Sequence, residues 1–182
     1  GGQADFLRLV IIDPTEKTIS PLQIDRDTMT PVAVLDVLGN RSGTRTLQIC
    51  LSHAFGDGRE QSCELTAEAV SNLLFHMPID HYVAMNLDGI SVLNDALGGV
   101  TVTLEDDFTA LDPAMTKGTT LTLQGKQAEY FVRSRRNIGT GTNEARMARQ
   151  QTYISQMLEL LHEKVLSSEN FAGELFDALS PY

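Results

Sequence analysis

The sequence has 182 residues, with 14 Lys or Arg against 24 Asp or Glu, so its formal net charge is −10. A chain of this length is typical of one domain and can bury about 70% of its unfolded surface. Its 42% hydrophobic and 21% charged residues are typical of a globular protein and argue against a disordered chain or a coiled coil. The acidic balance argues against nucleic-acid binding, because that class neutralises phosphates with a basic face.

No stretch approaches the ~20 consecutive apolar residues that span a bilayer. The two cysteines, Cys50 and Cys63, do not form a CxxC pair, and the four histidines show no HExxH or HxH spacing. The sequence therefore contains no recognised metal-binding motif. Two separate thiols and a Cys50–Cys63 disulfide are both compatible with this spacing.

The N-terminal part is predicted to begin with a hairpin. Residues 6–13 are apolar and β-branched, and residues 17–24 follow after the turn at Asp13-Pro14, so we expect two short strands. The first is nearly continuously apolar, which favours a central strand of a sheet. Residues 29–61 contain several glycines among polar residues, and their pattern assigns no element.

Helices and strands alternate in the middle of the chain. A helix is predicted over 66–76, with Thr66 as its N-cap. We expect a strand over 82–85, a short helix over 89–97 and another strand over 100–104.

The C-terminal third is predicted to be mostly helical. One helix begins after Gly125 and runs into Arg133, the longest covers 144–166, and the last covers 169–179. The alternation of strands and helices predicts an α/β protein, with helices packed around one sheet.

Positive charge is concentrated in residues 133–149. This stretch contains five arginines and one acid, so it carries +4 while the remaining residues carry −14. The arginines are Arg133, Arg135, Arg136, Arg146 and Arg149. Guanidinium groups bind phosphate and carboxylate oxygens through a planar fork. A phosphate site and salt bridges to the acidic excess are equally supported by this clustering.

The helix predicted over 144–166 places Arg146, Arg149 and Gln150 on one face close to its N-terminus. The helix dipole favours an anion at that end. Elsewhere, Arg26 and Asp27 follow a predicted strand, where α/β proteins often bind ligands. Asp5 could ligate a divalent cation, and residues 105–107 are predicted to be a solvated acidic loop.

Eight blocks, in chain order, resemble the LytR–CpsA–Psr family of cell-envelope proteins over essentially the whole chain. They are Gln3–Asp5, Ile24–Thr28, His53–Gly58, Pro78–Ala84, Asn94–Val100, Leu123–Ala128, Phe131–Arg135 and Arg146–Gln151. The resemblance implies a three-layer α/β/α sandwich with a mixed central sheet. It also implies that residues 1–182 form a single catalytic domain, cut at its N-terminal edge.

The family transfers a phosphate-linked glycopolymer, such as teichoic acid or capsule, from a polyprenyl-pyrophosphate carrier to peptidoglycan. The resemblance therefore implies a phosphotransferase that uses Mg²⁺ or Mn²⁺ and works at the extracellular face of the membrane. An N-terminal membrane anchor outside these residues is part of this expectation.

Family roles carry over to matching positions. Arg26, Arg133, Arg135, Arg146 and Gln150 are expected to be catalytic residues that face the pyrophosphate. From their positions in the sequence rather than from the family, Arg149 on the same helix face and Asp27 next to Arg26 are expected to bind substrate. Asp5 matches the second of two metal-site aspartates, and the first would lie upstream of this sequence. The resemblance places Val70, Leu74 and Val83 along a slot for the lipid tail. Asn143 stands where the family usually has aspartate.

Two other activities are compatible with the same arginines. A lipid-pyrophosphate hydrolase would use water as the acceptor in place of a sugar hydroxyl. A non-catalytic envelope module would bind polyprenyl phosphate or glycan without turnover, and the neutral Asn143 favours that alternative.

Overall fold

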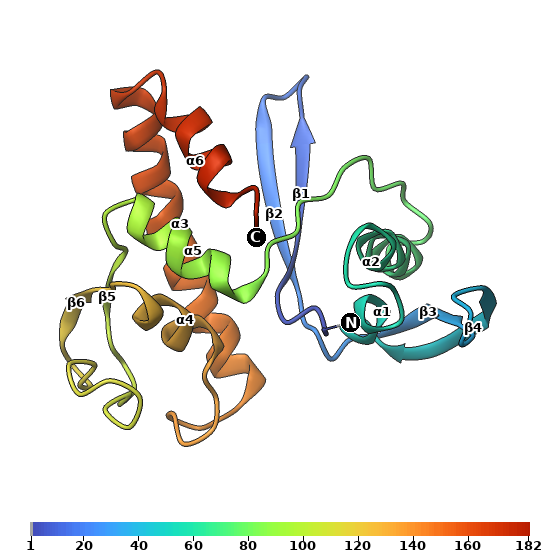
Figure 1. Ribbon diagram of the computed structural model, residues 1–182, viewed down its shortest axis with the longest axis horizontal. Helices are drawn as coiled ribbons and strands as arrows, with labels where there is room; N and C mark the ends of the chain where they lie inside the picture. The colour runs from blue at the N-terminus through green and yellow to red at the C-terminus, as the bar shows by residue number, and fades with distance from the viewer. Residues whose placement is uncertain (1) are drawn as a thin grey trace. The chain divides into compact units, whose positions relative to one another are not determined.

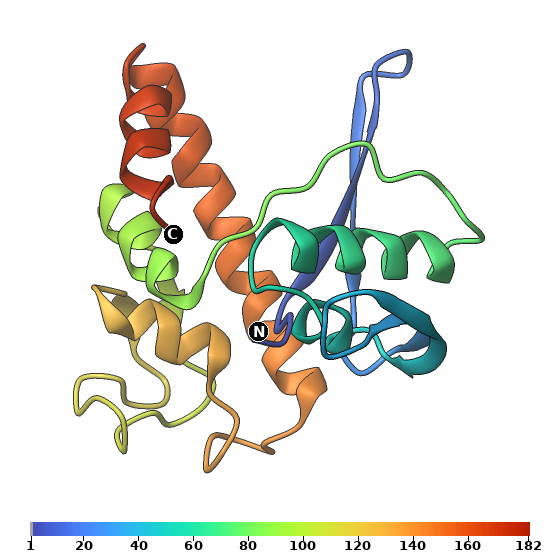
Figure 2. The ribbon, with the colours of Figure 1, turned by 45° about the vertical axis from the view of Figure 1, so that its right-hand side comes forward.

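The computed structural model describes residues 2–182, which form two compact units. Unit 1 ends at Ala84 and unit 2 spans Met85–Tyr182. Figures 1 and 2 show the elements of both. The expectation that 1–182 forms a single domain depends on how these units associate and stays a prediction.

Unit 1 begins with the expected hairpin. Strand β1 (Leu7–Asp13) pairs antiparallel with β2 (Thr18–Ile24). Asp13 closes the turn, because its Oδ1 accepts hydrogen bonds from the amides of Thr15 at 2.8 Å and Glu16 at 3.0 Å. Among the described strands β1 pairs only with β2, so the expected central position of this strand is not observed.

A second hairpin lies in the stretch to which the sequence assigned no element. Strand β3 (Met29–Leu35) pairs with β4 (Arg41–Gln48). Its turn is held by Asp36, whose Oδ1 accepts from the amides of Leu38 at 2.8 Å and Asn40 at 2.9 Å. Strand β4 is almost entirely polar and exposed, so it lacks the alternation that reveals a half-buried strand.

The short helix α1 (Leu51–Ala54) and helix α2 (Glu60–Leu73) complete unit 1. Helix α2 begins six residues before the expected Thr66, whose hydroxyl instead donates to the carbonyl of Ser62 at 2.9 Å inside the helix. The core of unit 1 is formed by Ile24, Val32, Ile49, Ala69 and Val70.

The strand expected over 82–85 is wrong, because this stretch is irregular and Val83 is 98% exposed. Its apolar run resembles a buried strand in composition. No neighbouring strand pairs with it in the described chain, so the composition alone was misleading.

Unit 2 is mostly helical, as expected. Helix α3 (Leu87–Ala96) is capped by Asn86, and the short strands β5 (Thr101–Thr103) and β6 (Thr120–Thr122) pair antiparallel. Helices α4 (Lys126–Arg133), α5 (Asn143–Ser167) and α6 (Phe171–Leu179) follow. Figure 2 shows α3 and α6 lying beside α5.

The core of unit 2 is built around Phe108 and Phe131, whose ring centroids lie 5.9 Å apart. It includes Leu104, Met115, Leu123 and Ile138. Within this core Asn94 is fully buried and donates through Nδ2 to the carbonyl of Leu123 at 2.8 Å. Helix α3 is thereby fixed to the segment that leads into α4.

The α/β class is confirmed, although the sheet differs from the single mixed sheet that the resemblance implied. The described strands form three separate two-stranded antiparallel pairs. None of the helices over residues 2–182 is both long enough and apolar enough to cross a membrane.

The turn after α3 contains two adjacent glycines, Gly98 and Gly99, and glycine is needed more strongly at Gly99. Gly98 and Gly99 both have positive φ, +89° and +95°, but only a Cβ at Gly99 would meet backbone, at 2.7 Å from the carbonyl oxygen of Leu123. We expect Gly99→Ala to lower the free energy of unfolding by about 2 kcal/mol or more, and Gly98→Ala by about 1 kcal/mol. Urea unfolding of the two variants checks this, and equal losses would show that the close approach does not matter.

Candidate functional site

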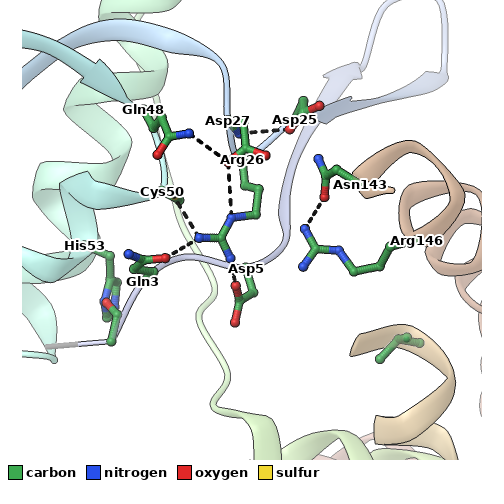
Figure 3. A network of polar contacts seen from close by, with 12 residues as sticks. Gln3, Asp5, Asp25, Arg26, Asp27, Gln48, Cys50, His53, Asn143 and Arg146 are labelled. Carbon is green, nitrogen blue, oxygen red and sulfur yellow. Dashed lines mark hydrogen bonds and ion pairs between the residues drawn. The ribbon is translucent and has the colours of Figure 1, made fainter. Parts of the chain in front are cut away.

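Arg26 forms the centre of a polar cluster in unit 1 (Figure 3). Its Nη1 pairs with Oδ1 of Asp5, and its Nη2 donates to Oε1 of Gln3 and to Sγ of Cys50 at 3.3 Å. The side chain is 13% exposed. Two residues to which the sequence assigned separate roles, Arg26 and Asp5, are therefore in contact.

The turn after β2 positions Asp27 beside this guanidinium. Asp25 Oδ1 accepts from the amide of Asp27 at 2.8 Å, a local bond that holds the turn. Asp27 Oδ1 lies 3.7 Å from Nε of Arg26 and accepts from Nε2 of Gln48 at 3.1 Å. Acidic and amide oxygens thus surround Arg26 on several sides.

The neighbouring cysteines are not bonded to each other. Cys50 and Cys63 are both free thiols, of which Cys50 is buried and Cys63 half-buried. Burial raises the pKa of the Cys63 thiol, and the negative charges of Asp57 and Glu60 raise it further. Of the two arrangements compatible with the sequence, separate thiols are confirmed.

In unit 2, Arg146 lies in the first turns of α5 and is 3% exposed. Its Nη2 donates to Oδ1 of Asn143, as the dashed line in Figure 3 shows. Thr142 caps the helix by accepting from the amide of Ala145 at 3.2 Å. The residue that replaces the family's usual aspartate therefore contacts the arginine that follows it by three positions.

Arg149 and Gln150 lie on the same face of α5, as their spacing predicted, and both are buried. Arg149 Nη1 donates to Oδ2 of Asp106 at 3.0 Å and Nε donates to the carbonyl of Phe131 at 3.0 Å. Burial lowers the pKa of the Arg149 guanidinium, while Asp106 acts in the opposite direction. Asp106 is therefore an ion-pair partner and not simply part of a solvated loop.

The other three arginines of the 133–149 stretch line a pocket of about 460 Å³ in unit 2. Its walls include Arg133, Arg135 and Arg136, together with the apolar side chains of Ala110 and Leu111. Arg133 also pairs with Glu129 one turn earlier, at 3.0 Å, while its side chain stays 52% exposed. Some arginines of this cluster form salt bridges and others line a pocket, so the structure contains features of both alternatives, the salt bridges and the anion site.

The three expected lipid contacts lie in different environments within unit 1. Val70 belongs to the buried core, Leu74 packs against it, and Val83 is almost fully exposed. The structure brings Val70 and Leu74 together but does not place Val83 with them. Their role in binding a lipid tail stays a prediction.

Sequence reasoning missed Gln48, which donates to Asp27, and three further residues in these clusters. Gln3 and Cys50 contact Arg26, and Asp106 contacts Arg149. Gln3 had a signal, because it belongs to the first family-like block. Cys50 and Asp106 reach their partners only through tertiary packing, which residue spacing does not reveal.

The oxygen atoms around Arg26 are of the kind that Mg²⁺ and Mn²⁺ bind. Asp5 and Asp27 offer carboxylates and Gln3 offers a carbonyl oxygen. Mg²⁺ commonly takes one or two protein carboxylates and completes its shell with water and substrate phosphate oxygens. Both carboxylates are paired with the Arg26 guanidinium, and no group of three or more His, Cys, Asp or Glu within residues 2–182 could hold a metal ion, so the metal site stays a prediction.

The sequence pattern that defines the LytR_cpsA_psr family matches residues 1–181. A relative from Halalkalibacterium halodurans, named polyisoprenyl-teichoic acid–peptidoglycan teichoic acid transferase TagU, is 30% identical over 98% of this chain and 53% of its own length. The chain therefore belongs to the LytR–CpsA–Psr family.

Solved structures agree with this assignment. The crystal structure of Bacillus subtilis TagV matches 87% of this chain and 57% of its own with a TM-score of 0.65 and 28% identity. A Streptococcus agalactiae protein matches 99% of this chain and 59% of its own with a TM-score of 0.80 at 24% identity, which supports the fold. The chain spans about half the length of the TagU relative.

Proposed function

We propose that this chain is part of a phosphotransferase that moves a phosphate-linked glycopolymer from a polyprenyl-pyrophosphate carrier to peptidoglycan. Membership of the family supports this proposal, as does the name of the TagU relative, which specifies transfer of teichoic acid to peptidoglycan. The proposed place of action is the extracellular face of the cell membrane, where such a carrier and peptidoglycan meet. Membrane attachment through a segment outside these residues is part of the same proposal.

The observation that carries the proposal is the pocket lined by Arg133, Arg135 and Arg136. Several guanidinium groups at one pocket, in a chain with a net charge of −10, favour an anion with several oxygens. Arginine suits phosphate because its donors form paired hydrogen bonds and it stays charged when partly buried.

The proposed reaction is a phosphoryl transfer. A sugar hydroxyl of peptidoglycan attacks the phosphorus that bears the glycan, and the bond from that phosphorus to the bridging oxygen breaks. Polyprenyl phosphate leaves, and the glycan is joined to the acceptor through a phosphodiester. The arginines neutralise the charge that develops on the leaving phosphate, which is the main task of a protein in such reactions.

The hydroxyl proton must pass to a base as the new bond forms. Asp5 and Asp27 are the carboxylates at Arg26, and solvent is the other acceptor. We propose that Asp5 also holds Mg²⁺ or Mn²⁺, with Asp27 and Gln3 as neighbouring oxygen donors. Such an ion supplies positive charge to phosphoryl oxygens.

The decisive experiment gives the full-length protein a polyprenyl-pyrophosphate glycan with and without a muropeptide acceptor, in the presence of Mg²⁺. Acceptor-dependent formation of a glycan phosphodiester is the expected result. Release of glycan phosphate without an acceptor would identify a hydrolase. Binding with no turnover under both conditions would identify a non-catalytic module and contradict the proposal.

Asn143 offers a separate test of the electrostatics at the start of α5. We expect Asn143→Asp to raise the free energy of unfolding by about 0.5 kcal/mol at low salt, because a carboxylate there faces both the helix N-terminus and Arg146. Urea unfolding at low salt and in 1 M NaCl measures this gain, which should disappear at high salt. The matched control is Asn137→Asp, outside the helix, and an equal gain there would refute the local explanation.

A further inference from the structure

Side chains of α5 hold the C-terminal end of α4. Arg149 donates from Nε to the carbonyl of Phe131 at 3.0 Å and from Nη2 to the carbonyl of Ser134, and Gln150 donates to the carbonyl of Val132 at 3.1 Å. The last backbone carbonyls of a helix have no hydrogen-bond donor within the helix itself. Here α5 supplies those donors, at residues on both sides of Arg133.

The same guanidinium also fixes the loop that follows. Its Nη1 pairs with Asp106 at 3.0 Å, and its Cζ lies 5.4 Å from the centre of the Phe108 ring. A Cβ added at Gly139 would lie 2.3 Å from Oδ1 of Asp106. The loop after Arg136 therefore closes directly onto the carboxylate that Arg149 holds.

A turn connects the loop over residues 137–141 to the pocket arginines that precede it. The amide of Ile138 donates to the carbonyl of Arg135 at 3.2 Å, and the Ile138 side chain is 1% exposed. Arg149 thus connects two structures that flank the arginine-lined pocket, the end of α4 and the loop over residues 137–141. Movement of its guanidinium would release both.

We propose that Arg149 is a positioning residue, which fixes the backbone of residues 133–136 so that their guanidinium groups face the pocket. Its side chain is only 9% exposed, and Nε, Nη1 and Nη2 each donate to a protein oxygen. This replaces the expectation, drawn from spacing, that Arg149 binds the substrate itself. The identity of the ligand rests on the proposed function, whereas the positioning is a property of unit 2.

Lysine cannot reproduce this arrangement, because its ammonium lacks the planar fork that reaches three acceptors at once. Arg149→Lys keeps the charge and most of the volume but loses the geometry. It therefore separates a positioning role from a merely electrostatic one, and Arg135→Ala serves as the matched variant that removes a pocket arginine.

The first measurement is hydrogen–deuterium exchange of the ligand-free 182-residue chain. For Arg149→Lys we expect amides of residues 134–141 to exchange at least about tenfold faster, because local opening becomes easier, while residues 152–166 stay unchanged. Arg135→Ala should leave exchange in both stretches unchanged. Gly139→Ala, which displaces Asp106, should accelerate the same loop and repeats the test if Arg149→Lys does not fold.

The second measurement is calorimetry with a short polyprenyl pyrophosphate. Each single variant is expected to bind about tenfold more weakly, and the double variant only slightly more weakly than either, because coupled residues are not additive. Multiplied losses would mean that Arg149 contributes independently and would overturn the proposal, as would unchanged exchange in Arg149→Lys and Gly139→Ala. If the unmodified chain binds no pyrophosphate, the proposed function fails, while exchange still decides the positioning role.

Discussion

Arg135→Ala is expected to weaken binding of a short polyprenyl pyrophosphate at least about tenfold, and Arg146→Ala by a similar factor. A hydrogen bond between charged groups contributes roughly 1.5–3 kcal/mol, and about 1.4 kcal/mol corresponds to a factor of ten in affinity. Arg135 lines the pocket of unit 2, and Arg146 lies at the start of α5. Titration calorimetry measures both variants directly.

The control for this prediction is Arg45→Ala, which removes the same charge from an exposed position on β4. Its affinity should stay within about twofold of the unmodified chain, because Arg45 does not line the pocket and an exposed surface charge is screened by salt. Unchanged affinity in both Arg135→Ala and Arg146→Ala would contradict the phosphate-binding role. The arginine cluster would then be explained by salt bridges alone.

Asn94→Leu is expected to lower the free energy of unfolding by about 4 kcal/mol, because it leaves several buried polar groups without partners. Asn94 accepts from the amide of Val100 at 3.1 Å and from the hydroxyl of Tyr153 at 3.3 Å, and donates to the carbonyl of Leu123 at 2.8 Å. Leucine keeps the branch at Cγ and is larger than asparagine, so the substitution leaves no empty cavity. Urea unfolding provides the measurement.

Tyr153→Phe is the matched control, because it removes one of these bonds and keeps the ring. Burial raises the pKa of the Tyr153 phenol, so the hydroxyl stays neutral and able to donate. We expect this variant to lose about 1 kcal/mol. A loss for Asn94→Leu no larger than that for Tyr153→Phe would show that the amide network contributes little.

Asn94 also clarifies what one of the family-like blocks does. Its side chain joins α3 to Val100, just before β5, and to the segment before α4, and the adjacent Asp95 accepts from the amide of Gly125 at 2.8 Å. Gly99 allows the close approach of the carbonyl of Leu123. The Asn94–Val100 block is therefore structural, and it supports the elements that carry the arginines.

The sequence predicted the helices better than the strands. The helix expected over 144–166 is observed as Asn143–Ser167, because a long apolar stripe marks it clearly in the sequence. The hairpin β3–β4 was missed, since β4 is polar on both faces. Short strands depend on a partner that may lie anywhere in the chain, so local composition predicts them poorly.

The candidate site shows the same division between local and tertiary information. Spacing correctly placed Arg146, Arg149 and Gln150 on one face of α5, but it could not tell whether that face meets solvent or protein. All three are in fact buried, at 3%, 8% and 5% exposure. The acceptors of Arg149 include the carbonyl of Phe131 on α4 and the carboxylate of Asp106, which lie 18 and 43 residues earlier in the chain.

The rate at which the Cys50 thiol is alkylated can report on opening of the Arg26 cluster. Cys50 is fully buried with Sγ 3.3 Å from Nη2 of Arg26, whereas Cys63, the only other cysteine, is half-buried. A thiol reagent can reach Cys50 only when unit 1 opens around that arginine, so the slow phase of alkylation measures the frequency of opening. Any anion or cation that rigidifies the cluster will lengthen this phase, which turns an unmodified side chain into a reporter of ligand binding.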